Sequence, residues 1–202
     1  MEEVNFEDIS QIVKNLEKIG EGWRGQVYKG EFNSKVLTFK IPKNPSFIHL
    51  IKKEGEILRK INPYGIGGKL EIVGEDFLAY QYIDGIHLNE VINRDNYKNL
   101  VLQLFIQGRI LDRLGISKDE FHRPYKNVLV DKDLKVHLID FERAKFTEYP
   151  QNITQLIQFV ITGGNIFFKN VEKEKLIGLA KIYKKSQTEK NFERILNYLN
   201  LI

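Results

Sequence analysis

The chain has 202 residues, of which 42% are hydrophobic and 29% charged, so it is long enough to bury a core and is not expected to be disordered. It contains no cysteine, which excludes disulfide bonds and thiolate metal sites, and its net charge is only +4. No apolar run is long enough for a membrane span, and the acidic start MEEVNFEDIS is unlike a signal peptide. We therefore expect a folded cytoplasmic protein with no membrane partner.

The first third of the sequence carries mainly strand patterns. Apolar residues at three- and four-residue intervals predict a helix over residues 5–17. Two β-rich runs follow, 26–32 and 35–41, and the Asn-Ser pair between them is typical of a hairpin. A helical pattern covers 47–61, and two more strands are expected around the Gly-Glu-Asp turn at 74–76.

The rest of the sequence is mainly helical. A strong helical pattern over 97–115 ends at a glycine, and two further helical stretches lie near 150–162 and 171–200. Between them, two apolar runs around a polar turn predict a hairpin over 128–141. This order predicts an α+β fold with two lobes. Residues 1–82 would form a small antiparallel-sheet lobe with one main helix, and residues 83–202 a reduced helical lobe.

The stretch IGEGWRGQV holds three glycines, Gly20, Gly22 and Gly25, with the spacing G-x-G-x-x-G. In a dinucleotide-binding Rossmann unit such glycines open a helix. In a protein kinase they form the turn of a hairpin that covers the phosphates of ATP. Here they lead into the strand pattern at 26–32, and no regular βαβ alternation follows, so the hairpin is favoured.

Lys40 lies on the second predicted strand after these glycines, between Phe39 and Ile41. A lysine on an apolar strand is costly to bury unless it is paired. Glu54, on the apolar side of the next predicted helix, is a suitable partner, although it could also be an ordinary surface carboxylate. Lys43 is the alternative lysine. A cation of this kind is one of the parts that phosphoryl transfer needs.

The second half supplies candidate metal ligands. Asn127 stands before one strand of the predicted hairpin, and Asp140 stands at the end of the other. An amide oxygen and a carboxylate at one open end of a hairpin can share Mg²⁺, a hard ion that prefers oxygen ligands, and Mn²⁺ is a possible substitute. The alternative interpretation is a turn asparagine and a helix-capping aspartate.

Taken together, these motifs resemble the protein-kinase superfamily over about residues 17–160. IDFE at 139–142 is similar to the D-F-G motif, with Glu142 in place of its glycine. The chain looks most like the small atypical branch: RIO kinases, the kinase that accompanies the tRNA-threonylcarbamoylation complex, and predicted archaeal serine/threonine kinases. As in those relatives, no long activation segment or A-P-E motif is present. The resemblance implies ATP binding by Ile19, Gly20, Gly22, Gly25, Val27, Lys40, Glu54, Gln81 and Ile83, with Tyr80 behind the pocket.

The catalytic loop departs from the superfamily pattern. Kinases place a catalytic aspartate five residues before the metal-binding asparagine, and here that position holds His122. The family's acid followed by an apolar residue is matched instead by Glu120 and Phe121. We therefore interpret the loop as two residues longer, with Glu120 in the base position and Lys118 in that of the motif's histidine. Asp119 and His122 remain alternatives for the base.

The resemblance implies an ATP- and Mg²⁺-dependent atypical serine/threonine protein kinase in which Glu120, Lys40 and Asp140 act in catalysis. A protein would be the acceptor, and a partner in RNA modification or ribosome assembly is suggested by analogy alone. Glu142 and the altered loop motivate an alternative: a nucleotide-binding pseudokinase scaffold, or an ATPase that controls a partner. A small-molecule kinase is the third reading, although the sequence holds no obvious acidic insert for a cationic acceptor.

Overall fold

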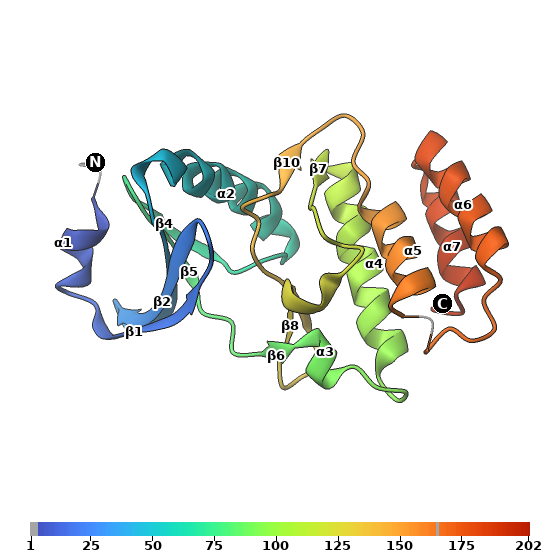
Figure 1. Ribbon diagram of the computed structural model, residues 1–202, viewed down its shortest axis with the longest axis horizontal. Coiled ribbons are helices and arrows are strands. Elements are labelled where there is room, and N and C mark those ends of the chain that lie inside the picture. The colour runs from blue at the N-terminus through green and yellow to red at the C-terminus, as the bar shows by residue number, and fades with distance from the viewer. Residues whose placement is uncertain (1–3, 165) are drawn as a thin grey trace. The chain divides into compact units, whose positions relative to one another are not determined.

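The computed structural model describes residues 4–164 and 166–202 and divides into two compact units (Figure 1). The first unit comprises the chain up to Asp84 together with the segment Asp140–Arg143, and the second comprises Gly85–Ile139 and Ala144–Ile202. The first three residues of the acidic N-terminus lie outside the described residues. None of the helices within the described ranges is long and apolar enough to cross a lipid bilayer.

The first unit is built on an antiparallel sheet of five strands in the order β1-β2-β3-β5-β4. The strands are β1 (Lys14–Glu21), β2 (Gly25–Phe32), β3 (Lys35–Pro42), β4 (Leu70–Val73) and β5 (Leu78–Gln81). The β2–β3 hairpin turns at Asn33 and Ser34, with φ of 50° and 60°. Two consecutive positive φ angles give the turn that matches the twist of paired strands. The strands predicted at 26–32, at 35–41 and on both sides of 74–76 are confirmed, whereas β1 was not predicted.

The helix predicted over residues 5–17 is wrong in its second half. The helix α1 spans Phe6–Ser10, and β1 begins at Lys14. Asn15 has a φ of 52°, which a helix cannot accommodate, and the pairing of β1 with β2 shifts register at this point. The apolar spacing indicated one longer helix because Ile9, in α1, and Val13, in the segment after α1, pack into the same core.

The two faces of this sheet are covered differently. On one face α1 helps to enclose a core that includes Ile9, Leu37, Phe39 and Phe77. On the other lies α2 (Ile48–Ile61), flanked by 3₁₀ turns at Pro45–Phe47 and Asn62–Tyr64. Gly55 lets α2 approach closely, because a Cβ there would lie 3.0 Å from a methyl group of Val73. The helical pattern predicted over 47–61 is confirmed and carries Glu54 toward the sheet.

The second unit is mostly helical. Its helices are α3 (Leu88–Val91), α4 (Tyr97–Arg113), α5 (Asn152–Thr162), α6 (Lys173–Lys185) and α7 (Glu189–Tyr198). A three-stranded sheet joins β6 (Ile86–His87), β8 (Val128–Val130) and β9 (Val136–Leu138), and β7 (Ile116–Ser117) pairs with β10 (Lys145–Phe146). A 3₁₀ turn at Pro124–Lys126 precedes β8. The predicted helices and hairpin are confirmed, so the α+β class with a sheet followed by a helical part holds, and it is compatible with a two-lobed kinase-like fold.

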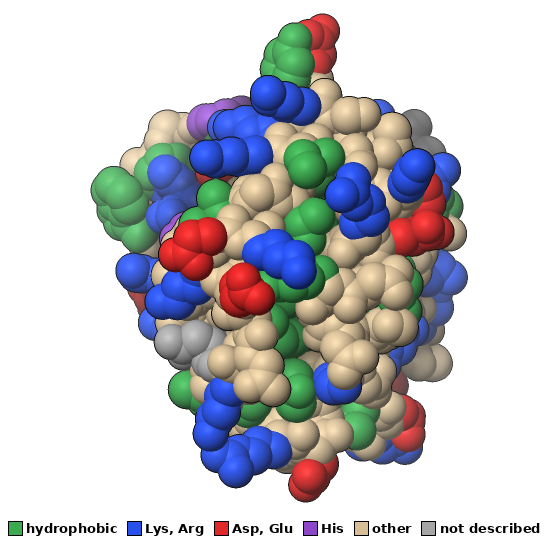
Figure 2. Space-filling model, turned by 90° about the vertical axis from the view of Figure 1, so that its right-hand side faces the viewer, with side chains coloured by type: hydrophobic (Ala, Val, Ile, Leu, Met, Phe, Trp, Pro, Cys, Tyr) green, Lys and Arg blue, Asp and Glu red, His purple; other side chains and the backbone are tan. Residues whose placement is uncertain are grey.

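The basic residues near the C-terminus lie on exposed helix surfaces. On α6, five lysines and the half-exposed Ile177 and Ile182 alternate with the buried Leu176 and Tyr183. Figure 2 shows Lys and Arg side chains distributed over the face that it presents, with hydrophobic side chains between them. The positive charge is therefore spread over the surface and does not form one continuous basic patch on that face.

Candidate functional site

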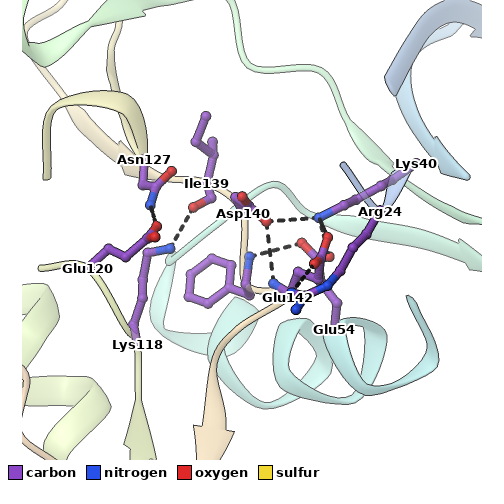
Figure 3. Close-up of polar contacts among 10 residues, drawn as sticks. Arg24, Lys40, Glu54, Lys118, Glu120, Asn127, Ile139, Asp140 and Glu142 are labelled. Carbon is purple, nitrogen blue, oxygen red and sulfur yellow. Dashed lines mark hydrogen bonds and ion pairs between the residues drawn. The ribbon is translucent and has the colours of Figure 1, made fainter. Parts of the chain in front are cut away.

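Lys40 is the centre of a charged cluster in the first unit. It lies on β3 with only 6% of its surface exposed, and its Nζ donates to Glu54 Oε2 at 2.7 Å and to Asp140 Oδ1 at 2.9 Å. In Figure 3 the lysine reaches both carboxylates. The pair predicted between Lys40 and Glu54 is therefore present. Lys43, the alternative lysine, is more exposed and contacts Glu21 instead.

The electrostatics of this cluster keep Lys40 charged. Burial by itself lowers the pKa of a lysine, but the carboxylates of Glu54 and Asp140 outweigh it and raise the pKa of Lys40 well above its usual range. The two carboxylates differ in exposure, because the side chain of Glu54 is 2% exposed and that of Asp140 is 51% exposed. Glu54 is thus a buried structural partner of Lys40, whereas about half of the Asp140 side chain is accessible to solvent.

Glu54 also ties down the segment that carries Asp140. Its second oxygen, Oε1, accepts the backbone N–H of Phe141 at 3.0 Å. The Phe141 side chain is buried, and one of its ring carbons lies 3.3 Å from the point where a Cβ on Gly67 would stand. Gly67 has a φ of 75°, a conformation that favours glycine. One glutamate therefore sets the positions of both the strand lysine and the IDFE segment.

The glycine motif forms the tip of the β1–β2 hairpin, as predicted. The N–H of Gly22 donates to the carbonyl of Gly25 at 2.9 Å and closes the turn. Gly25 has no room for a side chain, because a Cβ there would lie 2.9 Å from the carbonyl oxygen of Ile41. At the base of the turn, hydrogen bonds from Lys18 and Lys43 lower the pKa of Glu21 to about 2.

The other predicted nucleotide-binding residues lie in the same sheet or, for Ile83, directly after one of its strands. Val27 pairs with Gly20 on one side and with Lys40 on the other, and the half-exposed Ile19 adjoins them. At the end of β5, the N–H of Gln81 donates to the Lys69 carbonyl at 2.8 Å. Ile83 follows this strand. The structure thus brings the glycines, Val27 and Lys40 into one hairpin region, while the adenine contacts assigned to Gln81 and Ile83 stay predictions.

One contact was not predicted. Nη1 of Arg24, from the glycine turn, lies 3.0 Å from Oε1 of Glu142, and Oε2 of the same carboxylate lies 3.5 Å from Nζ of Lys40 (Figure 3). The sequence held a signal for it in the arginine within GWRG and the acid after IDF. Their pairing could not be derived from the sequence because 118 residues separate them.

In the second unit, the catalytic-loop candidates Glu120 and Asn127 contact each other. The Asn127 Nδ2 donates to Oε2 of Glu120 at 2.7 Å (Figure 3). Glu120 has a φ of 75°, a strained backbone for a residue with a side chain. Phe121, the apolar residue after it, is buried, whereas His122 is exposed. The buried Phe121 is compatible with the two-residue-longer loop, and the assignment of the base to Glu120 stays a prediction, with Asp119 and His122 as alternatives.

A buried polar network holds this loop. Lys118 is 1% exposed, and its Nζ donates to the carbonyl of Ile139 at 2.7 Å. Its backbone N–H donates to Oδ1 of Asn152 at 2.8 Å, and Asn152 Nδ2 donates to Oδ1 of Asp112 at 2.7 Å. Sequence reasoning missed Asn152 and Asp112, because an asparagine at the start of a helix and an aspartate within one resemble ordinary helix residues.

Comparisons with known proteins add one distant relative. No protein-family model matches the chain. It is 25% identical over 172 aligned residues to a probable serine/threonine-protein kinase, kinX, from Dictyostelium discoideum. The alignment covers 76% of this chain and 15% of the relative, so the chain spans a small part of that protein. With the fold, this similarity supports a distant protein-kinase-like relationship and no more.

Proposed function

We propose that the protein is an ATP- and Mg²⁺-dependent phosphotransferase of the atypical serine/threonine kinase type. The observation that carries the proposal is the buried Lys40–Glu54 ion pair, which reaches the half-exposed Asp140 and lies in the same sheet as the glycine hairpin. A buried lysine held charged beside a ligand-accessible carboxylate suits the binding of a metal-complexed polyphosphate. The distant similarity to a kinase supports the same reading.

In this proposal the first unit binds the nucleotide. Lys40 holds the α- and β-phosphates, and the backbone amides from Gly20 to Gly25 cover them. Ile19 and Val27 contact the base, and the backbone of Gln81 and Ile83 binds its edge. These roles rest on the resemblance to kinases and on the positions of the residues in or next to one sheet.

The proposed metal ligands have suitable chemistry. The Asn127 side chain uses its Nδ2 to donate to Glu120, so the Oδ1 oxygen of Asn127 can bind a cation. Asp140 offers a half-exposed carboxylate. Both supply the oxygen ligands that Mg²⁺ or Mn²⁺ prefers. When bound, the ion would neutralise charge on the phosphates.

The chemistry proposed is transfer of the γ-phosphoryl group to a protein hydroxyl. The hydroxyl oxygen forms a bond to the γ-phosphorus, the bond from that phosphorus to the β–γ bridging oxygen breaks, and ADP leaves. Glu120 orients the hydroxyl and accepts its proton late in the reaction. The hydrogen bond from Asn127 fixes the position of one oxygen of the Glu120 carboxylate.

The test is transfer of radiolabelled γ-phosphate from Mg·ATP to the protein or to a generic protein acceptor. We expect transfer by the wild type, loss in Asp140→Ala, and a loss of about 100-fold or more in Glu120→Gln. The exposed Asp95 and Glu90 offer matched controls, so Asp95→Ala and Glu90→Gln should retain activity. Activity that survives in Asp140→Ala would contradict the proposal. A silent Glu120→Gln with an inactive Asp140→Ala would contradict only the role of Glu120.

A second candidate, a nucleotide-binding scaffold, is favoured by one observation. Glu142, which stands where the D-F-G motif has glycine, places a carboxylate 3.5 Å from Lys40 in the phosphate-binding region. Nucleotide binding without transfer or hydrolysis, with either Mg²⁺ or Mn²⁺, would support the scaffold in place of the kinase.

A further inference from the structure

The turn at the tip of the β1–β2 hairpin fixes the position of Arg24. The turn is closed by the hydrogen bond between Gly22 and Gly25, and the carbonyl of Arg24 itself accepts the N–H of Lys43 at 2.8 Å. With its backbone held at the end of β3, the guanidinium extends to Glu142 (Figure 3). Its position therefore follows from the hairpin and does not depend on a flexible loop.

Glu142 is shared between two cations. One carboxylate oxygen faces Arg24 at 3.0 Å, and the other faces Lys40 at 3.5 Å. The Glu142 side chain is only 14% exposed, so the ion pairs are partly shielded from solvent. A small oxyanion bridging an arginine and a lysine is also the arrangement in which these two side chains bind a phosphate group.

Compared with Glu54, Glu142 is the carboxylate that an incoming anion can displace more easily. Glu54 is buried and already bonded to both Lys40 and the backbone of Phe141. Glu142 is held chiefly by the two side-chain cations, and its backbone N–H makes one long contact of 3.4 Å to Asp140. An incoming polyphosphate offers the same cations more negative charge than one carboxylate does.

We propose that Arg24 and Lys40 form a two-cation clamp for the phosphates of a nucleoside di- or triphosphate, and that the carboxylate of Glu142 fills this clamp in the nucleotide-free protein. The proposal rests on the proposed nucleotide-binding function and adds to it a specificity residue, Arg24, and an internal competitor, Glu142. Binding exchanges a carboxylate for a phosphate between the same two side chains, and no covalent step is involved.

Two substitutions have opposite expected effects. Arg24→Gln removes a charged donor and should weaken binding of Mg·ATP and Mg·ADP about 10-fold. Glu142→Gln removes the competing charge while keeping the shape, and should tighten binding of both several-fold. Arg24→Lys, which keeps the charge, should recover part of the affinity. Adenosine has no phosphate, so its affinity should not change in any of these variants.

The experiment is a titration of the full chain with Mg·ATP, Mg·ADP and adenosine, followed by calorimetry and by tryptophan fluorescence. Trp23 is the chain's only tryptophan, is 81% exposed, and has the Arg24 guanidinium 5.7 Å from its ring centroid, so its emission reports on this turn. Matched controls are Arg59→Gln and Glu56→Gln, at exposed positions of α2. Melting curves should show that all variants are folded.

The outcomes separate the clamp from the function on which it rests. Weaker binding in Arg24→Gln together with tighter binding in Glu142→Gln supports the clamp. If Glu142→Gln weakens polyphosphate binding as much as Arg24→Gln does, Glu142 assists the ligand and the clamp is overturned. If both variants bind like the controls, the clamp is overturned while nucleotide binding stands. A wild type that binds none of the three probes overturns the proposed function and the clamp together.

Discussion

Each unit of the protein buries a carboxylate among polar partners, and the two surroundings differ in what they leave open. Around Lys40, the carboxylate of Glu54 is buried, but the side chain of Asp140 is 51% exposed. Glu142 is held there by side-chain cations to which a ligand could bind in its place. Around Asp112, hydrogen bonds come from the Tyr183 hydroxyl at 2.8 Å and from the side chain and backbone of Asn152 at 2.7 and 3.0 Å.

The second network is closed to solvent. Asp112 is 5% exposed and Asn152 is fully buried, and Arg109 completes the group by donating to the Tyr183 hydroxyl at 3.1 Å. The aspartate receives backbone N–H groups at the start of α5, where no side chain of α5 caps the helix. We infer that Asp112, whose partners lie inside the protein, supports the fold, whereas Lys40, which has an accessible partner in Asp140, belongs to a candidate binding site.

The largest expected effect is a loss of stability when the network around Asp112 is disrupted. Asp112→Ala leaves buried donors of Asn152 and Tyr183 without an acceptor, and should lower the free energy of unfolding by about 3–5 kcal/mol. Denaturant unfolding measures it, with the exposed turn residue in Asp133→Ala as the control. A loss below about 1 kcal/mol would show that the network contributes little to the fold.

The open cluster should respond differently to a paired substitution. Lys40→Met leaves Glu54 buried without its cation and should cost about 2–4 kcal/mol, whereas the Lys40→Met/Glu54→Leu double variant should recover at least half of the loss. Nucleotide binding should be lost in both. Lys35→Met, which breaks the exposed pair with Glu71, is the control and should change stability by less than about 1 kcal/mol. Recovered binding in the double variant would contradict a functional role for Lys40.

The smallest expected effect is a dependence of stability on pH. Burial raises the pKa of Asp112 above its usual value of 3.8, and hydrogen bonds from Tyr183 and Asn152 offset this only in part. The folded protein therefore holds this proton more tightly than the unfolded chain does. The stability contributed is fully present below about pH 3.8 and is lost as the pH rises through the raised pKa.

The comparison with Asp112→Asn isolates that contribution, because the amide does not titrate. Denaturant unfolding at a series of pH values should show the stability of the wild type, relative to this variant, falling as the pH rises from about 3.8 and then levelling off. A relative stability that rises over the same range would mean that hydrogen bonding outweighs burial at Asp112.

Local patterns in the sequence determined most of the fold. The paired β-rich runs, the helix with Glu54 on its apolar face and the hairpin before Asp140 all follow from periodicity and turn residues within short windows. The same patterns predicted the contact between Lys40 and Glu54, because a lysine on an apolar strand calls for a carboxylate from the nearest helix. The same patterns gave a wrong prediction at residues 14–17, because the apolar spacing of a short helix and of the strand after it matches that of one longer helix.

Only the tertiary structure decided which distant polar groups meet. Arg24 and Glu142 are 118 residues apart, and Asp112 and Asn152 come from different helices. No local pattern encodes these pairs, since each residue taken alone is ordinary for its element. These groups pair because burying a polar group without a partner costs free energy, and that cost arises only once the elements have packed together.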